Sequence, residues 1–155
     1  MNATVSPPRI FIDSSVLFAA AISATGASRA LILLAEIGLL RLVICPLIFE
    51  EVERNLKVKA PEALPFFQRL QRALPWEIVS DPTLEEVQAC LNIIAAKDAP
   101  ILAAAIKANP HRLVTLDTRH FNRSEVKEVV KFPIQTPGEL LTDIRKALIV
   151  IIHPR

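Results

Sequence analysis

The regular structure of this chain is predicted to start at Arg9-Ile10-Phe11-Ile12-Asp13, a β-branched and aromatic run that ends in a carboxylate. A second apolar run, Arg112 to Asp117, ends in the same way. Helical patterns separate the two runs, and strands that alternate with helices predict a mainly parallel sheet. Both aspartates would then lie at the carboxyl edge of the sheet, where open α/β folds bind their ligands.

Further strands and helices extend this pattern along the chain. We expect strands at 9–12, 41–45, 76–79, 113–116 and 129–134. We expect helices at 16–22, from Ser28 (as N-cap) to about 37, at 47–57, from 61, from 83, at 101–108 and from 139. The fold class is therefore α/β, with a mainly parallel central sheet.

Composition indicates one folded domain. The chain has 155 residues, of which 52% are hydrophobic, with three glycines and twelve prolines scattered between segments. We expect a single domain over 1–155, with its core at about 9–142 and an apolar tail at 143–155. The β-branched run 147–152 could finish the last helix, add an edge strand or pack against a second subunit. The net charge of +2 does not by itself indicate nucleic-acid binding.

Cysteine usage and hydropathy bear on the cellular compartment. Cys45 and Cys90 lack metal-site spacing and lie in apolar segments, which predicts two buried, reduced thiols in a cytoplasmic protein. Asp13 and Ser14 interrupt the first apolar region, so we expect no signal peptide. No apolar run approaches the roughly 20 residues that span a bilayer, so we expect no membrane partner.

Four acidic residues stand where an ionised side chain costs stability unless it binds something: Asp13, Glu51, Asp98 and Asp117. A group of carboxylates with no basic partner is typical of a site for a hard divalent cation, which predicts Mg²⁺ or Mn²⁺. Clustered carboxylates repel one another when no cation is bound. We therefore expect Asp13→Asn to leave the metal-free protein at least as stable as the wild type.

The strand-terminal aspartates also have structural interpretations. Asp13 can cap the helix that follows it, and Asp117 can sit in a turn. Ser15, two residues after Asp13, is either a helix cap or a hydrogen-bond donor to a ligand carboxylate. Thr115, two residues before Asp117, is expected to act as a donor of the same kind.

The other two acids are ambiguous from spacing alone. Glu51 shares its helix with Glu50 and Glu53, and a charged helix face is normally solvated. Asp98 precedes Ala-Pro, which is the pattern of a helix N-cap, and an aspartate there also suits the helix dipole. Arg119, His120 and Arg123 follow Asp117 and are candidates to contact phosphate, although such a cluster is often only a basic surface.

Four motifs in this order resemble those of the PIN domain, the nuclease family named for the PilT N-terminus. The first, Phe11 to Leu17, has Asp followed two residues later by Ser; the second, Cys45 to Leu56, is a helix whose apolar positions select Glu51. The third, Lys97 to Ala105, is an Asp that opens a small-residue helix; the fourth, Leu113 to Phe121, is T-x-D followed by Phe. The resemblance covers about residues 9–142.

The resemblance implies a three-layer α/β/α sandwich and a ribonuclease that depends on Mg²⁺ or Mn²⁺. It assigns metal binding and catalysis to Asp13, Glu51, Asp98 and Asp117, with Asp117 completing the cluster. Ser15 stands where many members have Asn. Small PIN proteins are often the toxins of VapC-type toxin–antitoxin pairs, which implies an RNA substrate, an antitoxin partner and a homodimer or higher homo-oligomer. The apolar stretches 16–22 and 31–40 are candidates for the partner surface, or are ordinary core.

Two other functions compete with this one. A phosphotransfer domain with Asp13 as nucleophile would need a second acid nearby, and Ser15 stands in that place. A non-catalytic PIN-like RNA-binding or scaffold module would not need all four acids. Metal-dependent cleavage of RNA by the pure protein discriminates between the ribonuclease and the scaffold.

Overall fold

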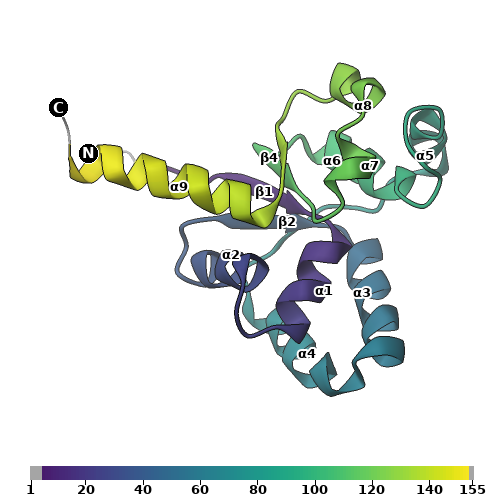
Figure 1. The fold of residues 1–155 in the computed structure, drawn as a ribbon. Helices are drawn as coiled ribbons and strands as arrows, with labels where there is room; N and C mark the ends of the chain where they lie inside the picture. The colour runs from purple at the N-terminus through teal and green to yellow at the C-terminus, as the bar shows by residue number, and fades with distance from the viewer. Residues whose placement is uncertain (1–4, 154–155) are drawn as a thin grey trace.

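The fold is built on a five-stranded parallel sheet, seen in a computed structural model that describes residues 5–153 (Figure 1). Residues 1–4 and 154–155 of the predicted domain lie outside this range. The strands are β1 (Arg9–Ile12), β2 (Arg41–Ile44), β3 (Glu77–Ile78), β4 (Arg112–Val114) and β5 (Ile134–Gln135). They lie in the order β3-β2-β1-β4-β5, so β1 is central and β1 pairs with both β2 and β4.

Helices fill every connection between the strands. In chain order they are α1 (Ser14–Ile22), α2 (Ala27–Glu36), α3 (Pro46–Lys59), the 3₁₀ turn η1 (Pro61–Ala63), α4 (Leu64–Ala73), α5 (Leu84–Cys90), α6 (Ala99–Ala108), α7 (Thr118–Phe121), α8 (Ser124–Val129) and α9 (Pro137–Ile152). Several begin at chemically suitable residues. Thr83 and Glu86 form a capping box on α5, and Thr136 caps α9 ahead of Pro137.

The helices form two layers around the sheet. The chain moves from β1 to β2 to β3 in one direction and then returns to β4 and β5 on the other side of β1. Because parallel crossovers are right-handed, this reversal sends α1–α4 to one face and α5–α8 to the other, as Figure 1 shows. The expected three-layer α/β/α sandwich is confirmed.

One hydrophobic core joins both faces of the sheet. Ile10, Phe11 and Ile12 of β1 are fully buried, as expected for the central strand of a sheet covered on both faces. Helix α6 packs through alanines, including the fully buried Ala104 and Ala105. Their small side chains let the α6 backbone lie close to its neighbours, and this fixes the position of Asp98, the residue just before the helix.

The last strand differs from the sequence prediction. The segment 129–134 was expected to be a strand, but Val129 ends α8 and β5 starts only at Ile134. Buried Val126 anchors α8 to the core. Pro133 has no N–H to donate. Its carbonyl accepts from Leu113 N of β4 at 3.0 Å, and the paired residues of the two strands start at Leu113 and Ile134.

Two further details differ or are settled. Ser28 is not a helix cap: Gly26 occupies the N-cap position of α2, and Ser28 is buried inside the helix. The run 147–152 finishes α9, the first of the three alternatives.

Cys45 and Cys90 are both buried free thiols, and burial raises the pKa of Cys45 to about 11.

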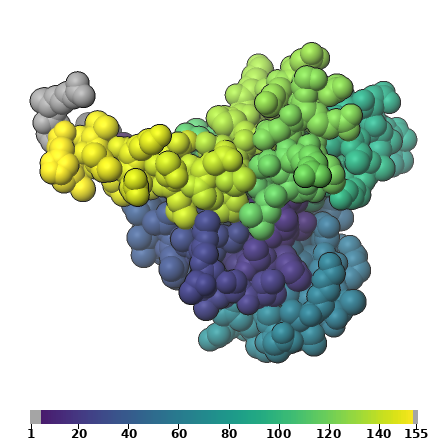
Figure 2. Space-filling view, viewed as in Figure 1, coloured from purple at the N-terminus to yellow at the C-terminus, as the bar shows by residue number. Residues whose placement is uncertain are grey.

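Helix α9 packs against α2 and then extends beyond the body of the molecule, as the space-filling view shows (Figure 2). Within residues 5–153 no single helix is long and apolar enough to cross a membrane. Helices α1 and α2 reach the required length and composition only as a pair, and they are bent by 93° relative to each other.

Candidate metal-binding site

A pocket of about 290 Å³ lies where the strand order reverses, and it brings the four predicted acids together. Asp13 follows β1, Glu51 lies on α3, Asp98 precedes α6 and Asp117 follows the β4 segment; all four line the pocket. They come from four separate parts of the chain. This position, at the carboxyl end of the central strands, is the one predicted from the two strand-terminal aspartates.

Asp13 is held by a dense set of hydrogen bonds. Its Oδ1 accepts from Ser14 N at 2.8 Å, so it caps α1. Its Oδ2 accepts from Ser15 Oγ and from Thr115 Oγ1, both at 2.8 Å. The side chain is buried. Asp13 is therefore both a helix cap and a fixed wall of the pocket, so the two interpretations of this residue do not exclude each other.

Ser15 and Thr115 connect the ends of the two central strands. Besides donating to Asp13, Ser15 Oγ accepts from Leu116 N at 3.1 Å. Thr115 Oγ1 accepts from Asp117 N at 2.9 Å, and its side chain is completely buried. Each hydroxyl thus donates to the segment after β1 and accepts from the segment after β4. These two side chains set the relative position of Asp13 and Asp117.

The structure separates the three glutamates of α3. Glu51 alone of the three lines the pocket. Glu50 is exposed, and Glu53 Oε1 lies 3.7 Å from Lys57 Nζ on the helix surface. Helical periodicity therefore places one carboxylate in the site and leaves two in solvent.

Asp98 occupies the N-cap position of α6 but does not cap it. Its side chain accepts no hydrogen bond from the helix, and its backbone is already in the helical region. Its side chain is only 14% exposed. Burial raises the pKa of the Asp98 carboxyl, and the charges of Asp13 and Asp117 raise that pKa further, against the lowering effects of Lys97 and His120. The capping interpretation of Asp98 is wrong.

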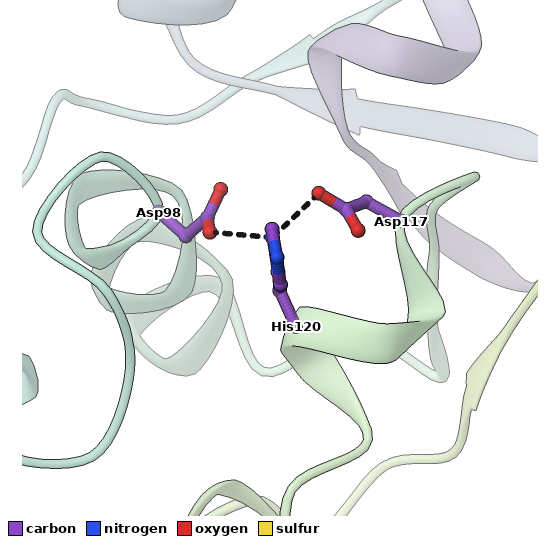
Figure 3. Close-up of side chains that lie close together, drawn as sticks. All are labelled: Asp98, Asp117 and His120. Atoms are coloured by element: carbon purple, nitrogen blue, oxygen red, sulfur yellow. Dashed lines mark ion pairs between the residues drawn. The ribbon is translucent and has the colours of Figure 1, made fainter.

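His120 on α7 lies between two of the acids (Figure 3). Its Nδ1 is 2.7 Å from Asp117 Oδ2 and 3.4 Å from Asp98 Oδ2. Neither contact has the geometry of a hydrogen bond, and both Asp98 Oδ2 and His120 Nδ1 are buried. The sequence placed His120 with the phosphate-contacting residues, whereas the structure directs its ring toward the carboxylates.

The basic residues at the pocket are not the ones the sequence suggested. Arg119 and Arg123 are exposed and do not line the pocket, and Arg123 lies near Glu125 instead. The pocket is lined by Lys97, whose Nζ is 4.0 Å from Asp117 Oδ2, and by Lys59.

Asn55 and Lys59 were missed in the sequence, although a signal for them exists. They follow Glu51 by four and eight residues, and residues at that spacing share one face of a helix. Once Glu51 is placed in the pocket, the spacing brings both side chains to the same side.

The donor set fits a divalent cation. The pocket gathers carboxylate oxygens, the ligands that hard cations prefer. Among residues 5–153, the buried side-chain atoms that lack a hydrogen-bond partner are Asp98 Oδ2 and His120 Nδ1, and both face this cluster. Asp98, Asp117 and His120 each offer one ligand atom, and the three atoms lie within 4.8 Å of one another.

Comparison with known proteins agrees with the motifs and the site. The model of the PIN domain family matches residues 9–119, which contain all four acids and most of the sheet. The chain belongs to the PIN domain family. No curated protein sequence matches it at a significant level.

Solved structures show the same PIN fold at low sequence identity. PAE2754 from Pyrobaculum aerophilum is 19% identical with a TM-score of 0.59, covering 90% of this chain and 97% of that one. FitAcB from Neisseria gonorrhoeae is 15% identical with a TM-score of 0.57, covering 83% and 98%. FitAB bound to an IR36 DNA fragment is 15% identical with a TM-score of 0.56, covering 83% and 94%.

Proposed function

We propose that this PIN-domain protein is a metal-dependent endoribonuclease that hydrolyses RNA phosphodiester bonds. We further propose that it acts in the cytoplasm as the toxin of a toxin–antitoxin pair. One observation carries the proposal: four carboxylates from four separate chain segments line one pocket at the reversal point of the sheet. A scaffold or simple binding module has no need to gather these costly charges in one place.

The four acids would hold Mg²⁺ or Mn²⁺. When bound, the cation supplies a water of lowered pKa and neutralises the charge that develops on the scissile phosphate. The protein contributes a fixed geometry. The hydroxyls of Ser15 and Thr115 orient the Asp13 carboxylate, and Thr115 also holds the backbone of Asp117. This preorganisation keeps the carboxylates in place despite their mutual repulsion.

Substrate binding is proposed for the two lysines that line the pocket. Lys59 and Lys97 reach it from opposite halves of the chain, on α3 and just before α6. Lysine side chains in such positions bind backbone phosphates without reading sequence, which suits an RNA backbone. Arg119 and Arg123 are exposed on α7 and next to α8, where they can extend the contact to phosphates farther along the strand.

Partner binding is proposed from the exposed apolar side chains. On α2 and the turn after it, Leu33, Ile37 and Leu39 are exposed, whereas Leu31 and Ile32 are core residues. The stretch 31–40 is therefore part core and part surface. Together with the apolar end of α9, these side chains would bind a second copy of the chain or an antitoxin, as VapC-type proteins do by resemblance.

The first test is cleavage of a mixed structured RNA by the purified protein with Mn²⁺, with EDTA, and with an Asp98→Asn variant. We expect cleavage only by the wild type with metal, because loss of the Asp98 carboxylate removes a central ligand. A matched pair on α3 adds a control: Glu51→Gln should abolish cleavage, and Glu50→Gln, which alters an exposed neighbour, should not.

The other outcomes are equally informative. The wild type could fail to cleave RNA while Mn²⁺ raises its melting temperature but not that of Asp98→Asn. This result would support the metal site and exclude the tested RNA as the substrate. No cleavage and no response to metal would reject the nuclease and favour a non-catalytic RNA-binding or scaffold role.

A further inference from the structure

Two buried side-chain atoms in the described residues have no hydrogen-bond partner, and they face each other. Asp98 Oδ2 and His120 Nδ1 are each almost fully removed from solvent, make no hydrogen bond and lie 3.4 Å apart. Asp117 Oδ2 approaches the same nitrogen to 2.7 Å. Buried polar atoms are nearly always paired. Two such atoms, with a third possible ligand atom beside them on Asp117, form the arrangement expected around a ligand that the protein side chains do not supply.

The spacing of these atoms fits a metal ion. Two ligand atoms at right angles around an ion, each bonded at about 2.1 Å, lie about 3 Å apart. The two distances from His120 Nδ1, 2.7 and 3.4 Å, fall on either side of this value. The carboxylates of Asp98 and Asp117 approach the imidazole from opposite sides (Figure 3), and all three atoms lie within 4.8 Å of one another.

An ion pair within the protein explains the arrangement less well. A charged imidazole between two carboxylates would normally donate along its N–H bond to one of them. Here the Nδ1–H direction satisfies neither acid, although both lie close. The backbone around His120 is fixed, because Phe121 on the same short helix is completely buried. The imidazole is thus held near the acids in an orientation that leaves its nitrogen free for a third group.

We propose that His120 is a metal ligand, and that Asp98, Asp117 and His120 bind one divalent transition-metal ion through two carboxylate oxygens and Nδ1. The inference rests on the proposed function, since both acids belong to its site, and it adds a nitrogen donor to a ligand set otherwise made of carboxylate oxygens. Imidazole favours first-row transition metals, whereas Mg²⁺ prefers oxygen ligands. His120 therefore biases the site toward Mn²⁺ and later transition metals over Mg²⁺.

Pulsed electron paramagnetic resonance tests this directly. Metal-free full-length protein is loaded with one equivalent of Mn²⁺, and the echo modulation from ¹⁴N nuclei bonded to the ion is recorded. We expect ¹⁴N modulation in the wild type and none in His120→Gln, which keeps the size of the side chain but removes the imidazole. Mn²⁺ affinity should fall about tenfold or more in the variant while Mg²⁺ affinity changes little, so the Mn²⁺/Mg²⁺ preference falls.

His153→Gln is the matched control, because it removes an exposed histidine at the end of α9 and should change neither the modulation nor the affinities. Mn²⁺ binding by the wild type without ¹⁴N modulation, or modulation that persists in His120→Gln, would overturn the inference. Either result leaves the carboxylate site and the proposed nuclease intact. Failure of the wild type to bind Mn²⁺ at all would overturn both, and RNA cleavage measured on the same samples separates these cases.

Discussion

At the scale of single residues, Asp13 and Asp98 are two carboxylates of one pocket that we expect to have opposite effects on stability. Asp13 accepts from one backbone amide and two hydroxyls, so its charge is well compensated. Asp98 Oδ2 is buried without a hydrogen-bond partner. The expectation that Asn would be tolerated in the metal-free protein, made for Asp13 from the sequence, therefore applies better to Asp98.

We predict that Asp98→Asn raises the melting temperature of the metal-free protein at pH 7 by a few degrees. The folded pKa of Asp98 is raised by burial above its ordinary value of 3.8. The folded protein thus binds this proton more tightly than the unfolded chain does. Its contribution to stability is present at low pH and is lost as pH rises through the raised pKa. The neutral Asn avoids that loss.

Differential scanning calorimetry in EDTA from pH 3 to pH 8 measures the effect. The advantage of Asp98→Asn should shrink as the pH falls toward 3.8, and Mn²⁺ should reverse the order by stabilising only the wild type. Asp13→Asn serves as the contrasting variant and should lose stability. An Asp98→Asn protein less stable than the wild type in EDTA at pH 7 would show that Asp98 has a structural partner.

The sequence was informative about residue types and less so about their partners. The apolar runs before Asp13 and Asp117 placed both at the sheet edge, because each run is long enough to be a buried strand. The spacing of two suggested Thr115 as a donor and left Ser15 as either a donor or a helix cap; both donate to Asp13. The contact between His120 and Asp98 could not be predicted from the sequence, because it depends on the packing of α7 beside the start of α6 rather than on a local pattern.

At the scale of elements, helix α6 positions Asp98 through close packing of small side chains. Ala103, Ala104 and Ala105 are all buried. We predict that Ala104→Leu destabilises the protein by about 1–3 kcal/mol, because added methylene groups force a well-packed helix away from its neighbours. The displacement of α6 should also weaken Mn²⁺ binding. Urea denaturation and Mn²⁺ titration measure the two effects.

Ala89→Leu on α5 is the control for this prediction, since it adds the same atoms at an exposed position. It should leave stability within about 0.5 kcal/mol of the wild type. A destabilised Ala104→Leu protein with unchanged Mn²⁺ affinity would show that α6 can shift without moving Asp98, and would contradict the positioning role of the helix.

Elements with strong periodic patterns were predicted correctly, whereas strand β5 and the short helices α7 and α8 were not. Strands β1 and β2 and helices α1, α3 and α6 have buried faces and clear ends, so local sequence determines them. Strand β5 has only two residues; of the valines before it, Val129 ends α8 and Val130 is the C-cap of that helix. Val129 and Val130 favour a strand locally, but the burial of Val126 and the missing N–H of Pro133 decide the outcome.

At the scale of the whole molecule, the end of α9 carries apolar side chains that a single copy of the chain leaves exposed to solvent. Val150, Ile151 and Ile152 are 69%, 72% and 67% exposed. Consecutive helical residues point in different directions, so this end is apolar all round, unlike the one-sided surface of an ordinary solvent-facing helix. Leu148 and Ile151 also line an apolar groove with Leu39, which joins the helix end to the exposed side chains after α2.

We predict that the wild type is a dimer and that Val150→Glu combined with Ile152→Glu converts it to a folded monomer. Burial of the apolar helix end drives association, and two charges in that interface would be left without partners. Light scattering after size-exclusion chromatography measures the mass, and circular dichroism measures the fold. Leu33→Arg, an exposed position on α2, reports whether the interface extends that far, whereas partly buried Leu34 would test the core instead.

Lys146→Glu is the control, because it reverses a charge at an exposed position on the same helix without entering the apolar end. It should keep the dimer mass. A wild type that is monomeric at micromolar concentration would contradict self-association and leave an antitoxin as the partner for this surface. Loss of the fold in the double Glu variant would show that the α9 end stabilises the single chain, although its side chains are exposed and contribute little burial there.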